Sequence, residues 1–210
     1  MKLLDPYDTR LNFYSKEVII SDIKTQSVQI LINDMKKFAL GERNIHQPRQ
    51  PSLVGLSAPQ AGVFLRVILV DICATPGKVN FKPKLKIFIN PKIVWASKKE
   101  ILSREGCYST GNICGAVYRS NSVKITALDE NGKEFIYKTD HYFQSCIIQH
   151  EIDHLNGVRF PSRVRKPEHL HIVDKDDFQS YRDKWRTWKK LCPFESWLKM
   201  YEGQERRAIN

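Results

Sequence analysis

Two histidines four positions apart, in the segment QHEIDHLNG at residues 149–157, place the strongest constraint on how this chain folds. Residues four apart share one face of an α-helix, so a helix here directs the imidazoles of His150 and His154 at one cation. Glu151 follows the first histidine and is placed to contact a metal-bound water rather than the metal. This H-E-x-x-H arrangement is typical of hydrolytic metal enzymes, and the alternative is a solvated polar helix face.

A catalytic metal site needs a third protein ligand and an open position for water, and the sequence leaves several candidates for that ligand. Downstream, His169 and His171 lie in the charged stretch RKPEHLHIVDKDD, where we expect both side chains at the surface. Upstream, Cys107 lies in SREGCYSTG, where a preceding glycine and the following polar residues indicate an exposed bend. A thiolate at Cys107 completes a Cys-His-His set, whereas spacing alone favours a small buried residue.

The size and composition indicate one folded domain. The chain has 210 residues, 41% of them hydrophobic, and a formal net charge of +11. This charge favours polyanionic partners such as RNA or anionic lipid, or else general solubility, and no RNP-type signature predicts sequence-specific nucleic-acid binding. No apolar run has the length of a membrane span, and no secretory signal is visible. Five scattered cysteines indicate reduced thiols in an intracellular compartment.

Hydrophobic periodicity predicts helices at both ends of a strand-rich region. Residues 21–40 form an amphipathic helix that Ser21 caps and Gly41 ends, followed by a polar loop over residues 42–52. Residues 141–155 form the helix that carries the two histidines. The strands between them are Val67 to Ile72, a strand over 86–94 broken at Pro91, and a hairpin over 122–138 that turns at Asn131-Gly132, with Val123, Ile125 and Ala127 facing inward.

This order of elements predicts an α+β fold with antiparallel sheet. The C-terminal segment differs in character. Phe178, Tyr181, Trp185 and Trp188 form an apolar seam at helical spacing, surrounded by basic residues and ended by Pro193. This helix either docks on its own domain or binds a partner or an anionic surface.

Three segments resemble, in order and approximate spacing, the three signature motifs of the peptide deformylases. They are VGLSAPQAG at 54–62, EGCYS at 105–109 and QHEIDHLNG at 149–157. The resemblance implies antiparallel or mixed sheets packed around a central helix that carries the H-E-x-x-H motif, with an N-terminal helix and a C-terminal helical extension. It implies a catalytic domain over residues 1–165. The basic, tryptophan-containing extension over 166–210 has no counterpart in the family motifs, and it is either part of the same domain or a partner-docking tail.

The resemblance further implies a metal-dependent hydrolase that removes the N-formyl group from N-formylmethionyl nascent peptides and releases formate. Family members hold one divalent ion through residues that correspond to Cys107, His150 and His154. Fe²⁺ is the usual physiological metal, with Zn²⁺, Ni²⁺ or Co²⁺ as substitutes, and a thiolate with two imidazoles suits all four. In the implied mechanism a metal-bound water attacks the formyl carbon with Glu151 as general base.

Other site residues carry over from the family motifs. The side-chain amide of Gln60 and the backbone N–H of Tyr108 correspond to groups that stabilise the negative charge on the formyl oxygen. Gly55 and Gly106 fit a backbone that substrate approaches closely, although Gly55 is equally consistent with a simple turn. The residues expected to surround the methionine side chain are Val54, Phe143, Cys146 and Ile147.

Glu105 and Arg119 form, by the same resemblance, a pair that braces the loop carrying Cys107. An ordinary surface ion pair is the alternative.

The chain departs from the bacterial form of the motifs at several positions. Leu53 stands where a glycine is usual, Tyr108 where leucine is frequent, and the segment STGN lacks a proline. The segment HYFQS before the third motif has bulky or polar residues where glycine and alanine are common. The missing glycine, the segment LSAPQ at 56–60 and the absent proline resemble the organellar eukaryotic branch and predict a mitochondrial location, with the cytoplasm as the alternative.

Three rival functions follow from the same residues. A general metallopeptidase needs the same metal and base with a longer cleft, and a divergent deformylase-like protein has an altered substrate or low activity. The third rival is a basic RNA- or ribosome-binding protein without catalysis. For an active enzyme, the basic tail suggests ribosome docking, and deletion of residues 176–210 is expected to weaken ribosome co-sedimentation but spare turnover of a small peptide.

Overall fold

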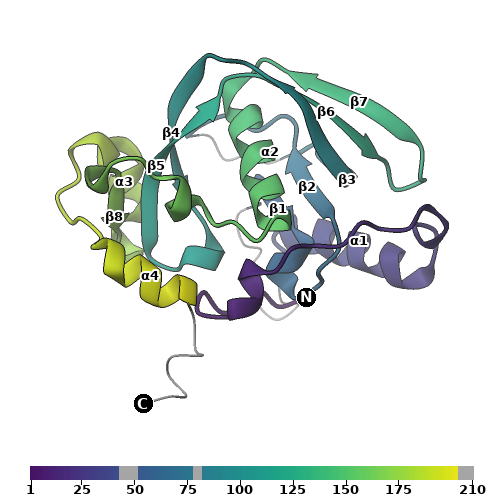
Figure 1. Cartoon of the computed structure of the whole chain (residues 1–210), viewed down its shortest axis with the longest axis horizontal. Helices are drawn as coiled ribbons and strands as arrows, with labels where there is room; N and C mark the ends of the chain where they lie inside the picture. Colours follow the sequence, from purple (N-terminus) through teal and green to yellow (C-terminus); the bar gives the residue numbers. More distant parts are fainter. Residues whose placement is uncertain (43–51, 78–81, 203–210) are drawn as a thin grey trace.

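A central helix, α2 (Tyr142–Leu155), lies between two antiparallel sheets (Figure 1). The computed structural model describes residues 1–42, 52–77 and 82–202. The larger sheet has the strand order β1 (Gly55–Ser57), β2 (Val67–Asp71), β3 (Leu85–Ala96), β6 (Val123–Leu128) and β7 (Glu134–Thr139). The smaller sheet has the order β4 (Glu100–Gly106), β5 (Ile113–Ser120) and β8 (Leu170–Ile172). The predicted α+β class with antiparallel sheets is confirmed.

The uninterrupted apolar run of β2 reflects burial of this strand on both faces. Val67 and Leu69 belong to a cluster with residues of the N-terminal helix α1 (Gln26–Ala39). Ile68 and Val70 belong to a second cluster with residues of α2. Because successive side chains of a strand point to opposite faces, a strand covered on both sides is apolar at every position.

The N-terminal helix begins later than its sequence pattern predicts. Residues Ile20–Asp22 form a separate 3-10 turn, and the Thr25 N–H donates to the Asp22 carbonyl, so the α-helix begins only at Gln26. Ser21 lies inside the 3-10 turn and does not cap α1, contrary to expectation. Gly41 has a φ of 86°, as suits a residue that ends a helix. Of the loop predicted over 42–52, residues 43–51 lie outside the described residues.

The prediction that a strand breaks at Pro91 is wrong, because β3 continues through that residue to Ala96. The pairing with β6 shifts register between Ile89 and Lys92, so Pro91 lies in a bulge where its missing N–H removes no regular ladder bond. Asn90 adopts a φ of 51°, and its side-chain amide bonds both the N–H and the carbonyl of Val18. The N-terminal segment therefore stabilises the bulge, which is a tertiary contact without a local sequence signal.

The predicted hairpin is confirmed as β6 and β7, which pair from Val123↔Thr139 to Leu128↔Glu134. Gly132 has a φ of 81° in the connecting turn. The inward residues Val123, Ile125 and Ala127 are buried against α2. The hairpin thereby covers the side of α2 that faces the larger sheet.

The C-terminal segment packs on the smaller sheet. Leu170–Ile172 adds strand β8 beside β5, and α3 (Phe178–Lys184) and α4 (Phe194–Glu202) follow. Tyr181 and Trp185, from the predicted apolar seam, are buried within the chain. The seam does not form one helix that Pro193 ends; α3 ends at Lys184, and Pro193 directly precedes α4, a position where proline is tolerated.

His171 is buried, so the expectation that it lies at the surface is wrong. One ring nitrogen, Nδ1, lies 2.9 Å from the Tyr181 hydroxyl, and Nε2 lies 2.9 Å from the Glu168 carbonyl. A neutral ring satisfies both contacts by accepting from Tyr181 and donating to Glu168. His171 therefore connects β8 with α3 and has no nitrogen left for a metal.

Among the helices within the described residues, none has the length and hydropathy that crossing a membrane requires.

We expect His171 to make the docking of the C-terminal segment depend on pH. Burial lowers the pKa of His171 below its usual 6.5, so the folded protein favours the neutral ring. The stability from this contact is full above the unfolded pKa and is lost as the pH falls through the lower folded pKa. The difference in thermal midpoint between the parent and His171→Asn should therefore narrow from about pH 7.5 to about pH 5.5 in scanning calorimetry. A constant or widening difference contradicts this role.

Candidate metal centre

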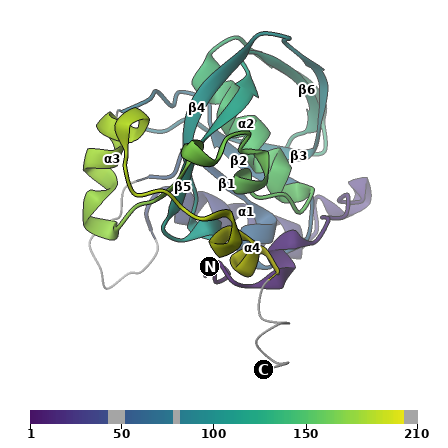
Figure 2. The same ribbon diagram turned by 60° about the vertical axis from the view of Figure 1, so that its left-hand side comes forward.

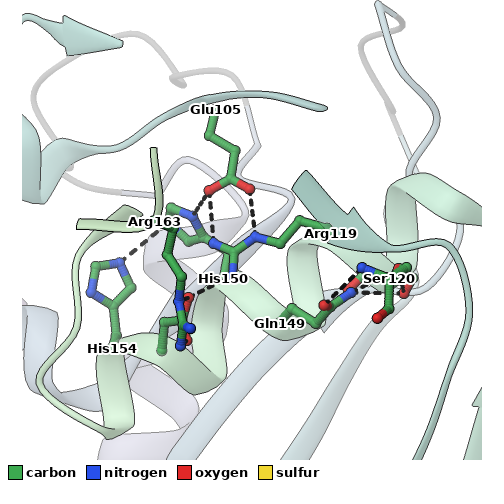
Figure 3. Close-up of polar contacts among 9 residues, drawn as sticks. Glu105, Arg119, Ser120, Gln149, His150, His154 and Arg163 are labelled. Carbon is green, nitrogen blue, oxygen red and sulfur yellow. Dashed lines mark hydrogen bonds and ion pairs between the residues drawn. The ribbon is translucent and has the colours of Figure 1, made fainter. Parts of the chain in front are cut away.

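Three segments that are distant in sequence meet beside α2. Cys107 follows the end of β4, and His150 and His154 project from one face of α2 (Figure 3). Gln60 lies in a short 3-10 helix, Ala58–Ala61, directly after β1. The segments that follow β4 and β1 thus place a thiol and an amide beside the helix that carries the two imidazoles.

The donor atoms of Cys107, His150 and His154 converge on one point. Cys107 Sγ lies 3.3 Å from His154 Nε2, and the two Nε2 atoms are 3.2 Å apart. Tetrahedral coordination with Zn–S and Zn–N bonds of normal length separates ligand atoms by roughly 3.3–3.6 Å. The chemistry and spacing of these donors therefore fit a divalent transition metal. Among the described residues, this is the one group of three such side chains whose ligand atoms lie together.

A buried charge network holds His150 in place (Figure 3). His150 Nδ1 lies 2.8 Å from Glu105 Oε2, and Arg119 binds both oxygens of the same carboxylate at 2.8 and 3.0 Å. Arg119 also donates to Asp153, which Arg163 binds from the outside. The Glu105–Arg119 pair is thus buried rather than on the surface, and it orients the imidazole so that Nε2 faces the thiol.

The network sets the ionisation of its members. Burial opposes charge on Glu105, but Arg119 and His150 outweigh it and lower the pKa of this carboxyl to about 2. Burial, followed by the positive charges of His150 and Arg159, lowers the pKa of His154 well below 6.5. A neutral imidazole is the form that binds a metal, and burial favours that form at His154.

Glu151 is buried in a setting that suits proton transfer. The residue is 4% exposed, and Oε2 has no hydrogen-bond partner among the described residues. Burial raises the pKa of Glu151 to about 7. At neutral pH the carboxyl can therefore both accept and return a proton.

Gly55 leaves the space that Glu151 occupies. A Cβ at this position would lie 2.4 Å from Glu151 Oε1 and 2.8 Å from Ile147 Cγ2. A simple turn glycine does not account for this contact, because the missing side chain is what admits the carboxylate. At Gly106 the constraint is milder, since a Cβ would meet Cys114 Sγ at 3.0 Å.

Hydrogen bonds hold the Gln60 amide in one orientation. Its Oε1 accepts from the Ser57 N–H at 2.9 Å and from Ser57 Oγ at 3.0 Å. Its Nε2 therefore points at the metal loop, 3.3 Å from both Cys107 Sγ and Ser109 Oγ. Ser57 was missed as a site residue, although S-x-x-Q at the start of a helix is a capping-box pattern that could have indicated it.

The remaining predicted residues lie at different places around α2. Tyr108 exposes 52% of its surface and begins the short 3-10 helix Tyr108–Thr110, which follows Cys107. Ile147 is buried beside Gly55, whereas Val54 is largely exposed. Phe143 and Ile147 share a row on α2 with Glu151, and Cys146 shares the adjacent row with His150 and His154.

We expect Glu105→Gln to weaken both stability and metal binding. The substitution removes a carboxylate from between Arg119 and His150, which should lower the free energy of unfolding by about 3 kcal/mol in denaturant titrations. Affinity for Co²⁺ should fall about 10- to 100-fold, because the imidazole loses its orienting partner. The matched control is Glu100→Gln, which breaks an ion pair with Arg165 whose side chains are 38% and 55% exposed. The Glu100→Gln substitution should lower the free energy of unfolding by less than about 1 kcal/mol. Equal losses of stability in the two variants would contradict the account.

Comparison with known proteins identifies the family. The model of the polypeptide deformylase family matches residues 2–169. Peptide deformylase 1 of Ralstonia nicotianae is 34% identical over 160 residues, which cover 76% of this chain and 83% of the relative. A peptide deformylase structure from Legionella pneumophila is 34% identical with a TM-score of 0.62, covering 78% of this chain and 85% of that chain.

A further solved structure is similar over almost its whole length. It is a class I type b peptide deformylase from Acinetobacter baumannii with bound Met-Ala-Ser. Its TM-score is 0.66 at 26% identity, and the match covers 78% of this chain and 98% of that one. The chain therefore belongs to the polypeptide deformylase family, the metal-dependent hydrolases that remove N-formyl groups.

Proposed function

We propose that this chain deformylates N-formylmethionyl peptides at the centre formed by Cys107, His150 and His154. The observation that carries the proposal is the joint presence of three converging metal donors and a buried carboxyl, Glu151, with an unpartnered oxygen. The Acinetobacter baumannii structure with bound Met-Ala-Ser supports a substrate that begins with methionine. A formate-release assay on formyl-Met-Ala-Ser tests the activity directly.

Different residues of the chain bind the metal, transfer the proton and stabilise the developing charge. Cys107, His150 and His154 would hold a divalent ion, which would supply Lewis acidity and make water a better nucleophile at neutral pH. Glu151 takes the proton from the nucleophile and gives it to the departing amine, as its pKa of about 7 permits. Gln60 presents Nε2 to the developing negative charge, and Ser57 holds that amide in place.

Fe²⁺ is the metal we propose for the working enzyme. A thiolate with two imidazoles is also compatible with Zn²⁺, Ni²⁺ or Co²⁺, so the donor set alone does not choose among them. Anaerobic purification followed by elemental analysis and a formate-release assay on the same sample identifies the ion that supports turnover.

We expect Glu151→Gln to abolish most turnover while the metal stays bound. An amide cannot take the proton, and loss of a general base typically lowers the rate about 10²- to 10⁴-fold. Formate release reports kcat, and elemental analysis reports metal content in the same preparation. Retained turnover in this variant would contradict the role of Glu151 as general base.

We expect Gly55→Ala to lower kcat without removing the metal. The added methyl group would overlap Glu151 Oε1, so either the carboxylate or the β1 backbone must move. Such a displacement of a proton-transfer group should reduce formate release about 100-fold. Wild-type turnover in Gly55→Ala would show that Glu151 does not need the position seen here.

The choice of substrate distinguishes a deformylase from the rival function, a general metallopeptidase. Formyl-Met-Ala-Ser and unformylated Met-Ala-Ser are assayed side by side for formate and for peptide-bond cleavage. A deformylase releases formate from the first and leaves both peptide backbones intact. A divergent protein with altered substrate preference binds metal normally but turns over formylmethionyl substrate poorly.

Membership of the organellar branch and a mitochondrial location stay predictions. They rest on Leu53 in place of a glycine, on the segment LSAPQ at 56–60 and on the absent proline in STGN. The relatives named above come from bacteria. Subcellular fractionation of the source cells, with the cytoplasm as the alternative, tests the location.

Ribosome docking also stays a prediction, and the exposed basic side chains of the tail are what supports it. Trp185 and Trp197 are buried in the chain, so only residues such as Lys184 and Lys189 are available to a ribosome. Deletion of residues 176–210 does not isolate this contact, because it also removes α4 from beside the metal loop. Co-sedimentation of variants altered only at Lys184 and Lys189 is the cleaner test.

A further inference from the structure

Arg159 is a fully buried arginine that the metal chemistry does not use. It follows α2 and has 0% exposure. Its acceptors among the described residues are three backbone carbonyls and one amide oxygen, none of them a carboxylate. A buried guanidinium without an ionic partner is unfavourable unless its N–H groups are bonded. Both Nη groups of Arg159 are bonded, whereas Nε has no hydrogen-bond partner among the described residues, so the four Nη contacts set its position.

The four acceptors come from three separate parts of the chain. Nη1 donates to the carbonyls of Pro6 at 2.6 Å and Ser109 at 3.0 Å. Nη2 donates to Asn12 Oδ1 at 3.0 Å and to the Met200 carbonyl at 3.2 Å. Arg159 therefore joins the N-terminal segment, the loop after Cys107 and helix α4 through one planar group.

Helix α4 encloses this guanidinium. The Arg159 guanidinium carbon lies 4.8 Å from the centroid of the Trp197 ring and 5.5 Å from that of Tyr201. Asn12 Nδ2 donates to the Tyr201 carbonyl at 2.5 Å, so α4 is also tied directly to the N-terminal segment. Figures 1 and 2 both show α4 alongside that segment.

The contacts continue from α4 to the metal loop. Cys107 packs against the apolar cluster that contains Trp197 and Met200. The residue that offers its carbonyl to Arg159, Ser109, also accepts from Gln60 through its hydroxyl. Movement of α4 would therefore disturb both the thiol and the amide that face the metal position.

We infer that α4 and Arg159 form a brace that positions the Cys107 loop, with Arg159 as a positioning residue rather than a catalytic one. The family match ends at residue 169, so α4 (Phe194–Glu202) is an addition to the matched domain that the metal loop of this chain uses. The inference rests on the metal centre of the proposed function and adds a role for the C-terminal segment. It predicts that weakening α4 loosens metal binding at a site that α4 does not ligate.

The test measures metal binding and thiol exposure in the full-length protein. In a Cys73→Ser background, Cys107 is the most accessible thiol, because Cys114, Cys146 and Cys192 are buried. Arg159→Met should weaken Co²⁺ binding about 10- to 100-fold and alter the thiolate-to-Co²⁺ absorption band. In the metal-free protein, the same substitution should raise the rate of Cys107 modification by a similar factor.

The matched control is Arg66→Met. Arg66 is also buried, at 5% exposure, and also donates to a backbone carbonyl and an asparagine oxygen, Leu155 O and Asn156 Oδ1. It does not bond the loop after Cys107, so its loss should lower the thermal midpoint without changing the Co²⁺ band or the Cys107 reaction rate. Equal Co²⁺ affinity and thiol reactivity in Arg159→Met and Arg66→Met would overturn the inference.

A second pair of variants tests α4 without touching Arg159. Lys199→Pro interrupts α4 at an exposed position, and Asp183→Pro interrupts α3 in the same way. The first should reproduce the metal and thiol effects of Arg159→Met, and the second should not. Unchanged Co²⁺ binding in Lys199→Pro refutes the brace. If the parent protein binds Co²⁺ through Cys107 but releases no formate, the proposed function fails while the brace stands.

Discussion

The carboxylate of Glu105 is the point on which the metal centre depends. It lies at the end of β4, two residues before Cys107, and is held by Arg119 from β5 and by His150 from α2. A buried carboxylate is stable only when its oxygens are bonded and its charge is matched, so these three elements cannot shift independently. The same contact that neutralises Glu105 also fixes the distance between the thiol-bearing loop and the helix with the imidazoles.

Around this contact, each reactive group is placed by a different physical constraint. Glu151 is admitted by the absent side chain of Gly55, and its pKa is raised by burial. Gln60 is oriented by Ser57, whose two donors leave only the amide nitrogen free to face the thiol. Different contacts thus position the proton-transfer group and the group that stabilises charge, although the Gln60 amide also contacts the metal ligand Cys107.

The C-terminal segment has a different role from the one that its composition predicts. A basic stretch with tryptophans favours a docking tail, but Trp185 and Trp197 are buried within the chain. Arg159 connects α4 to the N-terminal segment and to the carbonyl of Ser109. The N-terminal segment and α4 thus meet at the loop that follows Cys107.

Sequence patterns correctly predicted the elements that are specified by neighbouring residues. The hairpin β6–β7 and helix α2 follow from alternation, an Asn-Gly turn and the i, i+4 histidines, and motif resemblance located the metal donors and the Glu105–Arg119 pair. The wrong predictions concern residues whose conformation or burial depends on tertiary contacts. Pro91 continues β3 because Asn90 bonds Val18, and His171 is buried because Tyr181 covers it. Arg159 has no local signal, since its acceptors are three backbone carbonyls and one amide oxygen contributed by distant segments.

The central claim is that one sulfur and two imidazole nitrogens bind the same ion. X-ray absorption spectroscopy of the zinc-loaded protein measures this directly. The account predicts one sulfur at about 2.3 Å and two nitrogens at about 2.0–2.1 Å, with the sulfur signal absent in Cys107→Ser and retained in Cys73→Ser. A first shell of nitrogen and oxygen alone in the parent protein would contradict it.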